Sequence, residues 1–311
     1  MYHLGLGFCL FLIPAQVIYM RRGLGRFAAV LALSLGLILA ARLVILGAAR
    51  ELGEIGPLML VELFGVLALM GGLAAVNAFK PEGEVKLPAL LWATAAVGAL
   101  SIPLILYLRG SPSFAAATKQ LFASLEQSLQ GLAAQMGGLE VPEAERLFQP
   151  ETLRKLMGQF FLRTFAFDYF LLLAFSWWAG SRIGARAAGK QPGVRKLIQF
   201  TLPQGYVWPL IASLALILAD ATIGIGAAGF LAWNVCLVFL FLYGLEGLGI
   251  LQFLFHKYHL PRSLNWLAVL AVAALAMTPR IGVSILILFP ILGVSEIWIR
   301  YRREERRDEQ G

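Results

Sequence analysis

The sequence predicts an all-α membrane protein, a polytopic bundle of eight to nine transmembrane helices. Hydrophobic residues make up 59% and charged residues only 14% of its 311 residues, whereas about a quarter of a soluble globular chain is charged. Apolar runs as long as a membrane is wide follow one another along the chain. Basic residues gather in the short segments between these runs, which is typical of the loops of membrane proteins.

Nine apolar runs are candidate transmembrane spans, because a helix needs about 20 apolar residues to cross a bilayer. The seventh run is long and the eighth is short, and the last two could instead form a tilted pair or a re-entrant hairpin. The predicted spans are Tyr2–Met20, Gly25–Leu46, Pro57–Phe79, Leu87–Leu108, Phe160–Gly180, Tyr206–Ile223, Ala227–Phe255, Leu264–Met277 and Ile281–Ile299.

The loop charges predict an N-terminus outside and a C-terminus in the cytoplasm. With that orientation, most of the 26 Lys and Arg residues lie in cytoplasmic segments, including Arg21-Arg22 and the tail after Ile299. We divide the chain into a first group of four helices (1–108), an extracytoplasmic insert (109–158), a second group of four to five helices (159–300) and a charged cytoplasmic tail (301–311).

The insert is too polar to span a membrane. Its leucines recur at helical spacing, as on an amphipathic helix, and Gln149-Pro150-Glu151 is typical of a helix start. We expect a helical hairpin that lies on the membrane surface or caps the bundle; a solvated connector is the alternative. The leucines are Leu121, Leu125, Leu129 and Leu132.

Five charged residues inside the spans form the candidate ligand site. A charge at the centre of a spanning helix costs around 3 kcal/mol, so such residues face the bundle interior or water and find partners. The predicted orientation puts all five towards the outer leaflet, where they form a pocket for a small molecule or ion, or a framework of structural ion pairs. They are Arg42, Glu62, Arg163, Asp168 and Asp220. Arg42, Glu62 and Asp220 are also close enough to their helix ends to reach the lipid headgroups.

Two further acids lie in later spans. Glu246 belongs to the glycine-rich stretch Tyr243–Gly249, where glycines permit close helix contact, and it is either a protonated structural group or a proton-coupling site. Glu296 precedes Arg300 by four residues, the spacing of a local ion pair. Asn77 and Asn234 are expected to make hydrogen bonds between helices.

A basic loop follows the fifth predicted span. We expect it to contact anionic lipid headgroups or a protein partner; nucleic acid is excluded, since the net charge of +8 is distributed over short loops. Motifs for phosphate-binding loops, zinc proteases, serine hydrolases and paired cysteines are absent from the sequence, which predicts no ATPase, no enzyme, no cofactor and no metal site. The loop residues are Arg182, Arg186, Lys190, Arg195 and Lys196.

Three stretches of the C-terminal half carry a family resemblance: Leu202–Pro209, Leu242–Gly247 with the preceding Asn234, and Leu292–Trp298. With them the chain resembles the YybS-like family of bacterial integral membrane proteins, which is distantly similar to the substrate-binding subunits of energy-coupling-factor vitamin transporters and to the rod-shape protein MreD. That family often has Asp at the position of Glu296 and an amide at that of Glu246. The resemblance implies a multi-pass protein of the bacterial inner membrane.

Two functions therefore stand as hypotheses. The first is a substrate-binding or transport-type subunit for a small molecule, energised by an ATPase module on another protein. The second is a non-enzymatic membrane scaffold that docks partner proteins in the manner of MreD, through the basic loop and the tail.

Overall fold

The computed structural model describes residues 4–48, 52–79, 86–116, 118–120, 123–124, 127, 150–189, 197–259, 261, 274, 278–299 and 301–302. These residues are helical or lie in turns and connections, and none of them forms a strand. The predicted span Leu264–Met277, except for Ala274, lies outside the described residues, as do the four leucines of the insert and the tail after Arg302. The predicted all-α class is confirmed for the part that is described.

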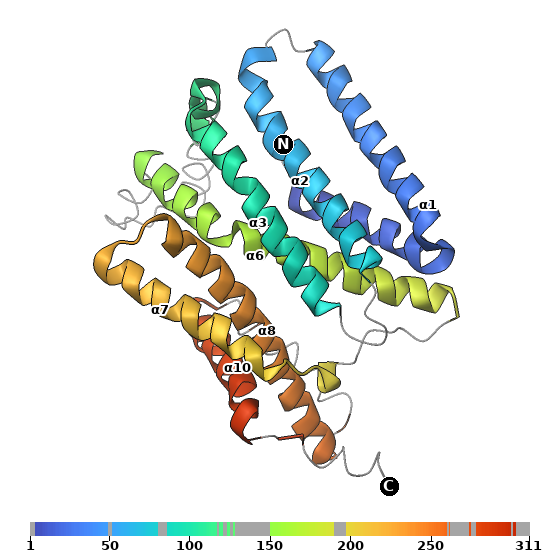
Figure 1. Ribbon diagram of the computed structural model, residues 1–311, viewed down its shortest axis with the longest axis vertical. Coiled ribbons are helices and arrows are strands. Elements are labelled where there is room, and N and C mark those ends of the chain that lie inside the picture. The colour runs from blue at the N-terminus through green and yellow to red at the C-terminus, as the bar shows by residue number, and fades with distance from the viewer. Residues whose placement is uncertain are drawn as a thin grey trace. The chain divides into compact units, whose positions relative to one another are not determined.

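The chain forms two compact helical units, Met1–Val194 and Arg195–Gly311. The first unit holds α1 (Leu4–Ala48), α2 (Leu52–Ala78), α3 (Leu87–Arg109) and α6 (Pro150–Ala187). Helix α6 packs against α1, α2 and α3, and α2 also packs against α1 and α3 (Figure 1). The fifth predicted span thus belongs to the same unit as the first four. The boundary between the two units, after Val194, lies later in the chain than the predicted start of the second group at residue 159.

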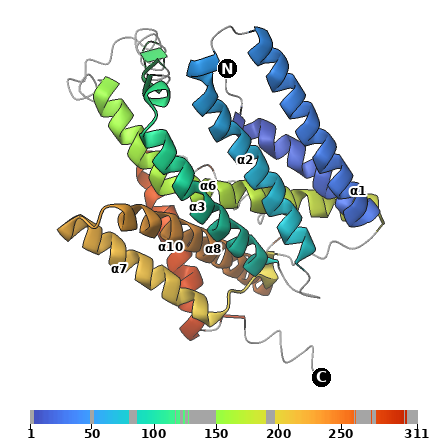
Figure 2. The same cartoon turned by 45° about the horizontal axis from the view of Figure 1, so that its top comes forward.

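Helix α1 consists of two arms that meet at Gly23. Its φ of 78° lies in the left-handed region, which glycine adopts without steric cost. The two blue arms consequently turn sharply away from each other (Figure 2). This kink falls between the first two predicted spans, so the sequence located the break correctly.

Helix α6 is longer than the fifth predicted span, Phe160–Gly180, at both ends. It begins at Pro150, where the proline signal predicted a helix of the insert, runs without a break into the predicted span, and continues past Gly180 to Ala187. A Cβ atom at Gly180 would clash with Gln16, and one at Gly184 would clash with Met20 on α1. Close packing against α1 therefore outweighs the poor helix propensity of glycine, and Arg182 and Arg186 lie on a helix instead of in a loop.

The second unit is built around α8 (Ala227–Lys257), with α7 (Val207–Ile223) and α10 (Pro279–Ile299) packed on it (Figure 1). Two short 3₁₀ turns, η1 (Leu197–Gln199) and η2 (Gln204–Tyr206), precede α7, and η1 also packs on α8. Glycines bring α8 and α10 into backbone contact. A Cβ atom at Gly247 would clash with the carbonyl of Phe289, and one at Gly293 would clash with the carbonyl of Tyr243.

Seven helices in the described part of the chain are long and apolar enough to cross a membrane, judged by length and composition. The first of the seven contains the kink at Gly23, so two predicted spans fall within it. The windows are Phe11–Ala41, Met59–Ala78, Leu87–Arg109, Lys155–Ala187, Gln204–Ile223, Ala227–Lys257 and Gly282–Ile299.

Candidate functional site

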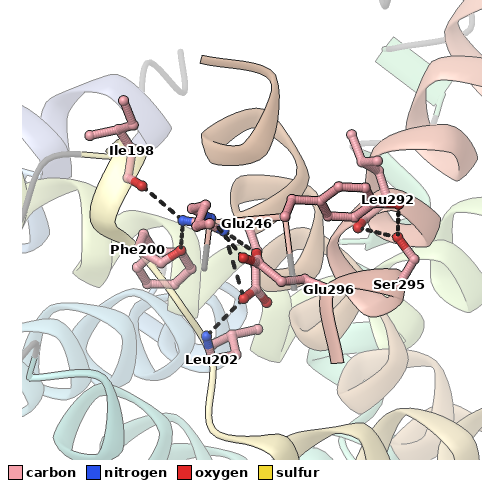
Figure 3. A network of polar contacts seen from close by, with 9 residues as sticks. Ile198, Phe200, Leu202, Glu246, Leu292, Ser295 and Glu296 are labelled. Carbon is pink, nitrogen blue, oxygen red and sulfur yellow. Dashed lines mark hydrogen bonds and ion pairs between the residues drawn. The ribbon is translucent and has the colours of Figure 1, made fainter. Parts of the chain in front are cut away.

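A buried ionic network in the second unit joins the region before α7 to α8 and to the end of α10. Its charged members are Arg302, Glu246 and Glu296, whose side chains are 9%, 5% and 12% exposed. Their polar groups converge with backbone groups of residues 198–202 (Figure 3). Glu246 comes from the middle of α8, Glu296 from the last turn of α10, and Arg302 from just after that helix.

Arg302 uses each of its three nitrogen atoms in this network. Its Nε donates to Glu296 Oε1 at 2.9 Å, and its Nη2 donates to Glu296 Oε2, so the pair is bidentate. Its Nη1 donates to the carbonyl oxygens of Ile198 and Phe200, both at 2.9 Å. The planar fork of a guanidinium suits this set of acceptors, which a lysine could not reach with the same geometry.

Glu246 has different hydrogen-bond partners from Glu296. Its Oε1 accepts a hydrogen bond from the backbone N–H of Leu202 at 3.2 Å and lies 3.9 Å from Arg302 Nη2. Close to these groups, Gly249 leaves room for the carbonyl of Leu197, which a side chain at that position would meet. The glycines of α8 therefore allow the region before α7 to approach the helix backbone and reach the carboxylate.

The first unit has a neutral counterpart between α1, α2 and α6. Gln16 Nε2 donates to Asn77 Oδ1 at 3.2 Å and to Ser181 Oγ at 3.0 Å, and Asn77 Nδ2 donates back to Gln16 Oε1 at 2.6 Å. All three side chains are buried. The prediction of hydrogen bonds between helices is confirmed for Asn77, whereas Asn234 Nδ2 donates to the carbonyl of Phe230 on its own helix at 2.8 Å.

The C-terminal end of α2, next to this neutral network, is capped by side chains from outside the helix. Tyr19 Oη donates to the carbonyl of Asn77 at 3.1 Å, and Lys86 Nζ donates to that of Val76 at 3.0 Å. These bonds satisfy carbonyl groups that have no partner within the helix. Burial lowers the pKa of Lys86 from its ordinary value, because a buried ammonium loses hydration.

Three residues of the predicted ligand site lie in the first unit with described side chains. Glu62 on α2 and Arg163 on α6 are half-buried, and Asp168 on α6 is exposed. Asp168 Oδ2 accepts a hydrogen bond from Thr164 Oγ1 at 2.9 Å. Arg42 lies on the second arm of α1, and its side chain is outside the described residues.

The register of α2 and α6 puts Glu62 and Arg163 at similar depth. Tyr169 Oη on α6 donates to the carbonyl of Ala68 on α2 at 2.9 Å. Further along the two helices, Ser181 of α6 and Asn77 of α2 both accept a hydrogen bond from the side-chain amide of Gln16. The two helices therefore run in the same direction. Glu62 precedes Ala68 by six residues, as Arg163 precedes Tyr169, and six residues rise about 9 Å on either helix.

Asp220, the fifth residue of the predicted site, belongs to the second unit. Its Oδ1 accepts a hydrogen bond from the backbone N–H of Gly226 at 3.2 Å, and its carboxylate fills the space beside Gly229. The intervening Gly224 ends α7 in the left-handed conformation, with a φ of 68°. Asp220 thus holds the turn between α7 and α8.

The basic residues after the fifth predicted span are described in part. The guanidinium of Arg182 lies 4.9 Å from the centroid of the Trp178 ring, and Trp178 and Arg186 are exposed. Lys190, Arg195 and Lys196 lie outside the described residues. The described part of the chain contains no group of three or more His, Cys, Asp or Glu residues that could hold a metal ion.

Sequence reasoning missed the roles of three residues. Arg302 was assigned to the charged cytoplasmic tail, and Glu296 was paired with Arg300, which lies outside the described residues, although its described partner is Arg302. Gln16 received no role, although a glutamine in an apolar run is a signal for a hydrogen bond between helices.

Comparison with known proteins identifies a family but no individual relative. Residues 2–293 match a family described as "Predicted membrane protein (DUF2232)". Neither the curated proteins nor the solved structures gave a match.

Proposed function

Since the chain belongs to the DUF2232 family of membrane proteins, we propose that it is a substrate-binding or transport-type subunit for a small molecule in the bacterial inner membrane. It has no ATPase of its own, is not an enzyme, and draws energy from another protein. The N-terminus lies outside and the C-terminus in the cytoplasm. The observation that carries the proposal is the exposed carboxylate of Asp168 within a spanning helix.

Asp168 lies near the middle of the candidate span Lys155–Ala187. A charge at this depth costs about 3 kcal/mol against lipid, and the hydrogen bond from Thr164 supplies only one partner. An exposed carboxylate in a membrane helix therefore needs water, a ligand or a partner protein beside it. A hydrated pocket open to a small molecule meets this requirement.

Two further charged residues support a site at this level. Arg163 precedes Asp168 on α6 by about one and a half turns, and Glu62 lies on the parallel helix α2 at the depth of Arg163. Glu62 and Arg163, an acidic and a basic group at one depth, would suit a ligand that carries both signs of charge or several hydrogen-bonding groups. Arg163 and Asp168 are five residues apart and do not share one face of α6.

Native mass spectrometry of the protein, extracted gently from its host membrane, tests the proposal. We expect a small-molecule adduct on the wild type that Asp168→Asn loses, with no change in thermal stability, because Asp168 is exposed. Asp220→Asn is the matched control, since it removes a carboxylate that holds a turn in the other unit and should keep the adduct. Retention of the adduct by Asp168→Asn, or a protein without any small-molecule adduct, would contradict the proposal.

A membrane scaffold is the second candidate, favoured by the basic end of α6. Arg182 stacks on Trp178, and Arg186 is exposed one turn further along. An aromatic and basic surface at a helix end is suited to lipid headgroups or to an acidic protein partner. In the same experiment, a stoichiometric protein partner that Arg186→Glu releases, without a small-molecule adduct, would favour the scaffold.

A further inference from the structure

The ionic network of the second unit carries one more negative charge than positive charge among its described groups. Glu246 and Glu296 are both acids, and Arg302 is the single described cation within ion-pair distance of them. In a site this well shielded from water, like charges raise the energy of the ionised state strongly. One of the two carboxylates is therefore the natural place for a proton.

The geometry indicates which of the two it is. Glu296 receives two hydrogen bonds from Arg302, through Nε and Nη2, so its charge is matched directly. Glu246 is 3.9 Å from the same Nη2, and its one described hydrogen bond comes from the neutral N–H of Leu202. The remaining nitrogen of Arg302, Nη1, is already committed to two backbone carbonyls.

Apart from Arg302, no cation among the described side chains lies within ion-pair distance of Glu246; Arg280 lies at the opposite end of α10 from Glu296, and Lys257 lies at the C-terminal end of α8. Residues 197–206 contain one titratable side chain, Tyr206, which packs edge-on against Phe239 of α8. On α7 the titratable group is Asp220, at the far end of that helix. After α10, Tyr301 shares a hydrogen bond with Ser295 at 3.2 Å.

On α8 itself, Tyr243 lies one turn before Glu246 and therefore on the same side of the helix. It is 1% exposed, and its hydroxyl has no hydrogen-bond partner among the described residues. The side of α8 that carries Glu246 thus holds a second polar group with unused hydrogen-bonding capacity.

We propose that Glu246 is a reversible proton-binding site, and that its proton controls how firmly the segment 197–202 is held on α8. The proton comes from the aqueous solution and forms an O–H bond with a carboxylate oxygen, which removes the negative charge that Arg302, the one cation described in the network, leaves unmatched. Ionised Glu246 is the stronger acceptor for the N–H of Leu202. Proton uptake therefore loosens the attachment of the chain just before α7.

The proposal deepens the proposed transport function without depending on the ligand site of the first unit. In a transport-type protein, a proton that changes the start of a spanning helix is a means of coupling proton movement to conformational change. The test below changes only residues of the ionic network, so its failure leaves the proposed role of Asp168 untouched. Retention of the adduct by Asp168→Asn, which would contradict the proposed ligand site, leaves the proton site at Glu246 untouched.

Infrared difference spectroscopy of the full chain in lipid nanodiscs tests the proposal. We record the C=O stretching band of protonated carboxylic acids while the solution is taken from mildly alkaline to mildly acidic pH. We expect the spectrum of wild type minus Glu246→Gln to contain a band that grows on acidification and shifts in D₂O. The absence of such a band, or a band that does not change with pH, would overturn the proposal.

Two further variants keep the test decisive. With Glu296→Gln, Arg302 balances the one remaining carboxylate, so the Glu246 band should shrink or vanish; an unchanged band would contradict the charge balance on which the proposal rests. If Glu246→Gln does not fold, Glu246→Asp replaces it. The shorter acid retains a band and shifts its frequency, whereas an unshifted band would assign the proton to another residue.

Discussion

The two units hold their helices and connecting segments together with side chains of different chemistry. Each joins three separate segments through buried polar side chains next to glycines that allow close helix contact. The first unit uses amides and a hydroxyl, which keep their protonation states at all moderate pH values. The second uses two carboxylates and a guanidinium. The comparison suggests that one unit is held by fixed hydrogen bonds and the other by contacts that a proton can change.

Removal of Arg302 should have the largest effect. Arg302→Gln leaves two buried carboxylates without their cation and two carbonyls without their donor, and breaking a buried ion pair costs about 3 to 5 kcal/mol. We expect a loss of that size in the free energy of unfolding, measured by denaturant titration in nanodiscs. The double variant Arg302→Gln with Glu296→Gln should recover part of it; a double variant less stable than the single one would contradict the charge argument.

The glycine contact between α8 and α10 should come next. Gly293→Ala places a methyl group against the carbonyl of Tyr243, and overpacking of this kind costs about 1 to 3 kcal/mol. Gly71→Ala on α2 is the control, since no other atom lies within 4 Å of its added Cβ. Thermal unfolding of the two variants should differ clearly, and equal stability would argue against the close crossing.

Loss of the neutral network should cost less than loss of the ionic one. Gln16→Leu leaves Asn77 and Ser181 without their shared amide, and a hydrogen bond between membrane helices contributes about 0.6 to 2 kcal/mol. The loss should be the same at mildly acidic and mildly alkaline pH. A clear pH dependence of this loss, measured by denaturant titration at both values, would contradict the assignment of a fixed network to the first unit.

The smallest predicted effect is a gain. Tyr243→Phe removes a buried hydroxyl that has no partner among the described residues, and a buried polar group without a partner is unfavourable. We expect the melting temperature to rise slightly. A fall would indicate that the hydroxyl has a bonding role.

The helices could be predicted from the sequence because apolar length and charge breaks act locally. The break near Gly23, the start of α6 at Pro150 and the end of α7 at Ile223 all follow from such signals. The continuation of α6 through Gly180 and Gly184 could not be predicted, since it depends on the approach of α1, which is distant in sequence.

The candidate site was harder to predict, because depth in a membrane does not determine which side chains meet. Depth alone grouped Asp220 with Glu62, Arg163 and Asp168, yet Asp220 holds a turn in the other unit. The contact of Arg302 with Ile198 and Phe200 joins residues about a hundred positions apart. A contact between residues so far apart in the chain leaves no periodic pattern in a single sequence.

The pH dependence of amide hydrogen exchange tests the difference between the two units most directly. The full chain in nanodiscs is measured at mildly alkaline and mildly acidic pH, with rates corrected for intrinsic exchange. We predict that residues 197–206 lose protection on acidification in the wild type and not in Glu246→Gln, while peptides that contain Gln16, Asn77 or Ser181 keep theirs. Equal changes in both units, or a change that persists in Glu246→Gln, would contradict the account.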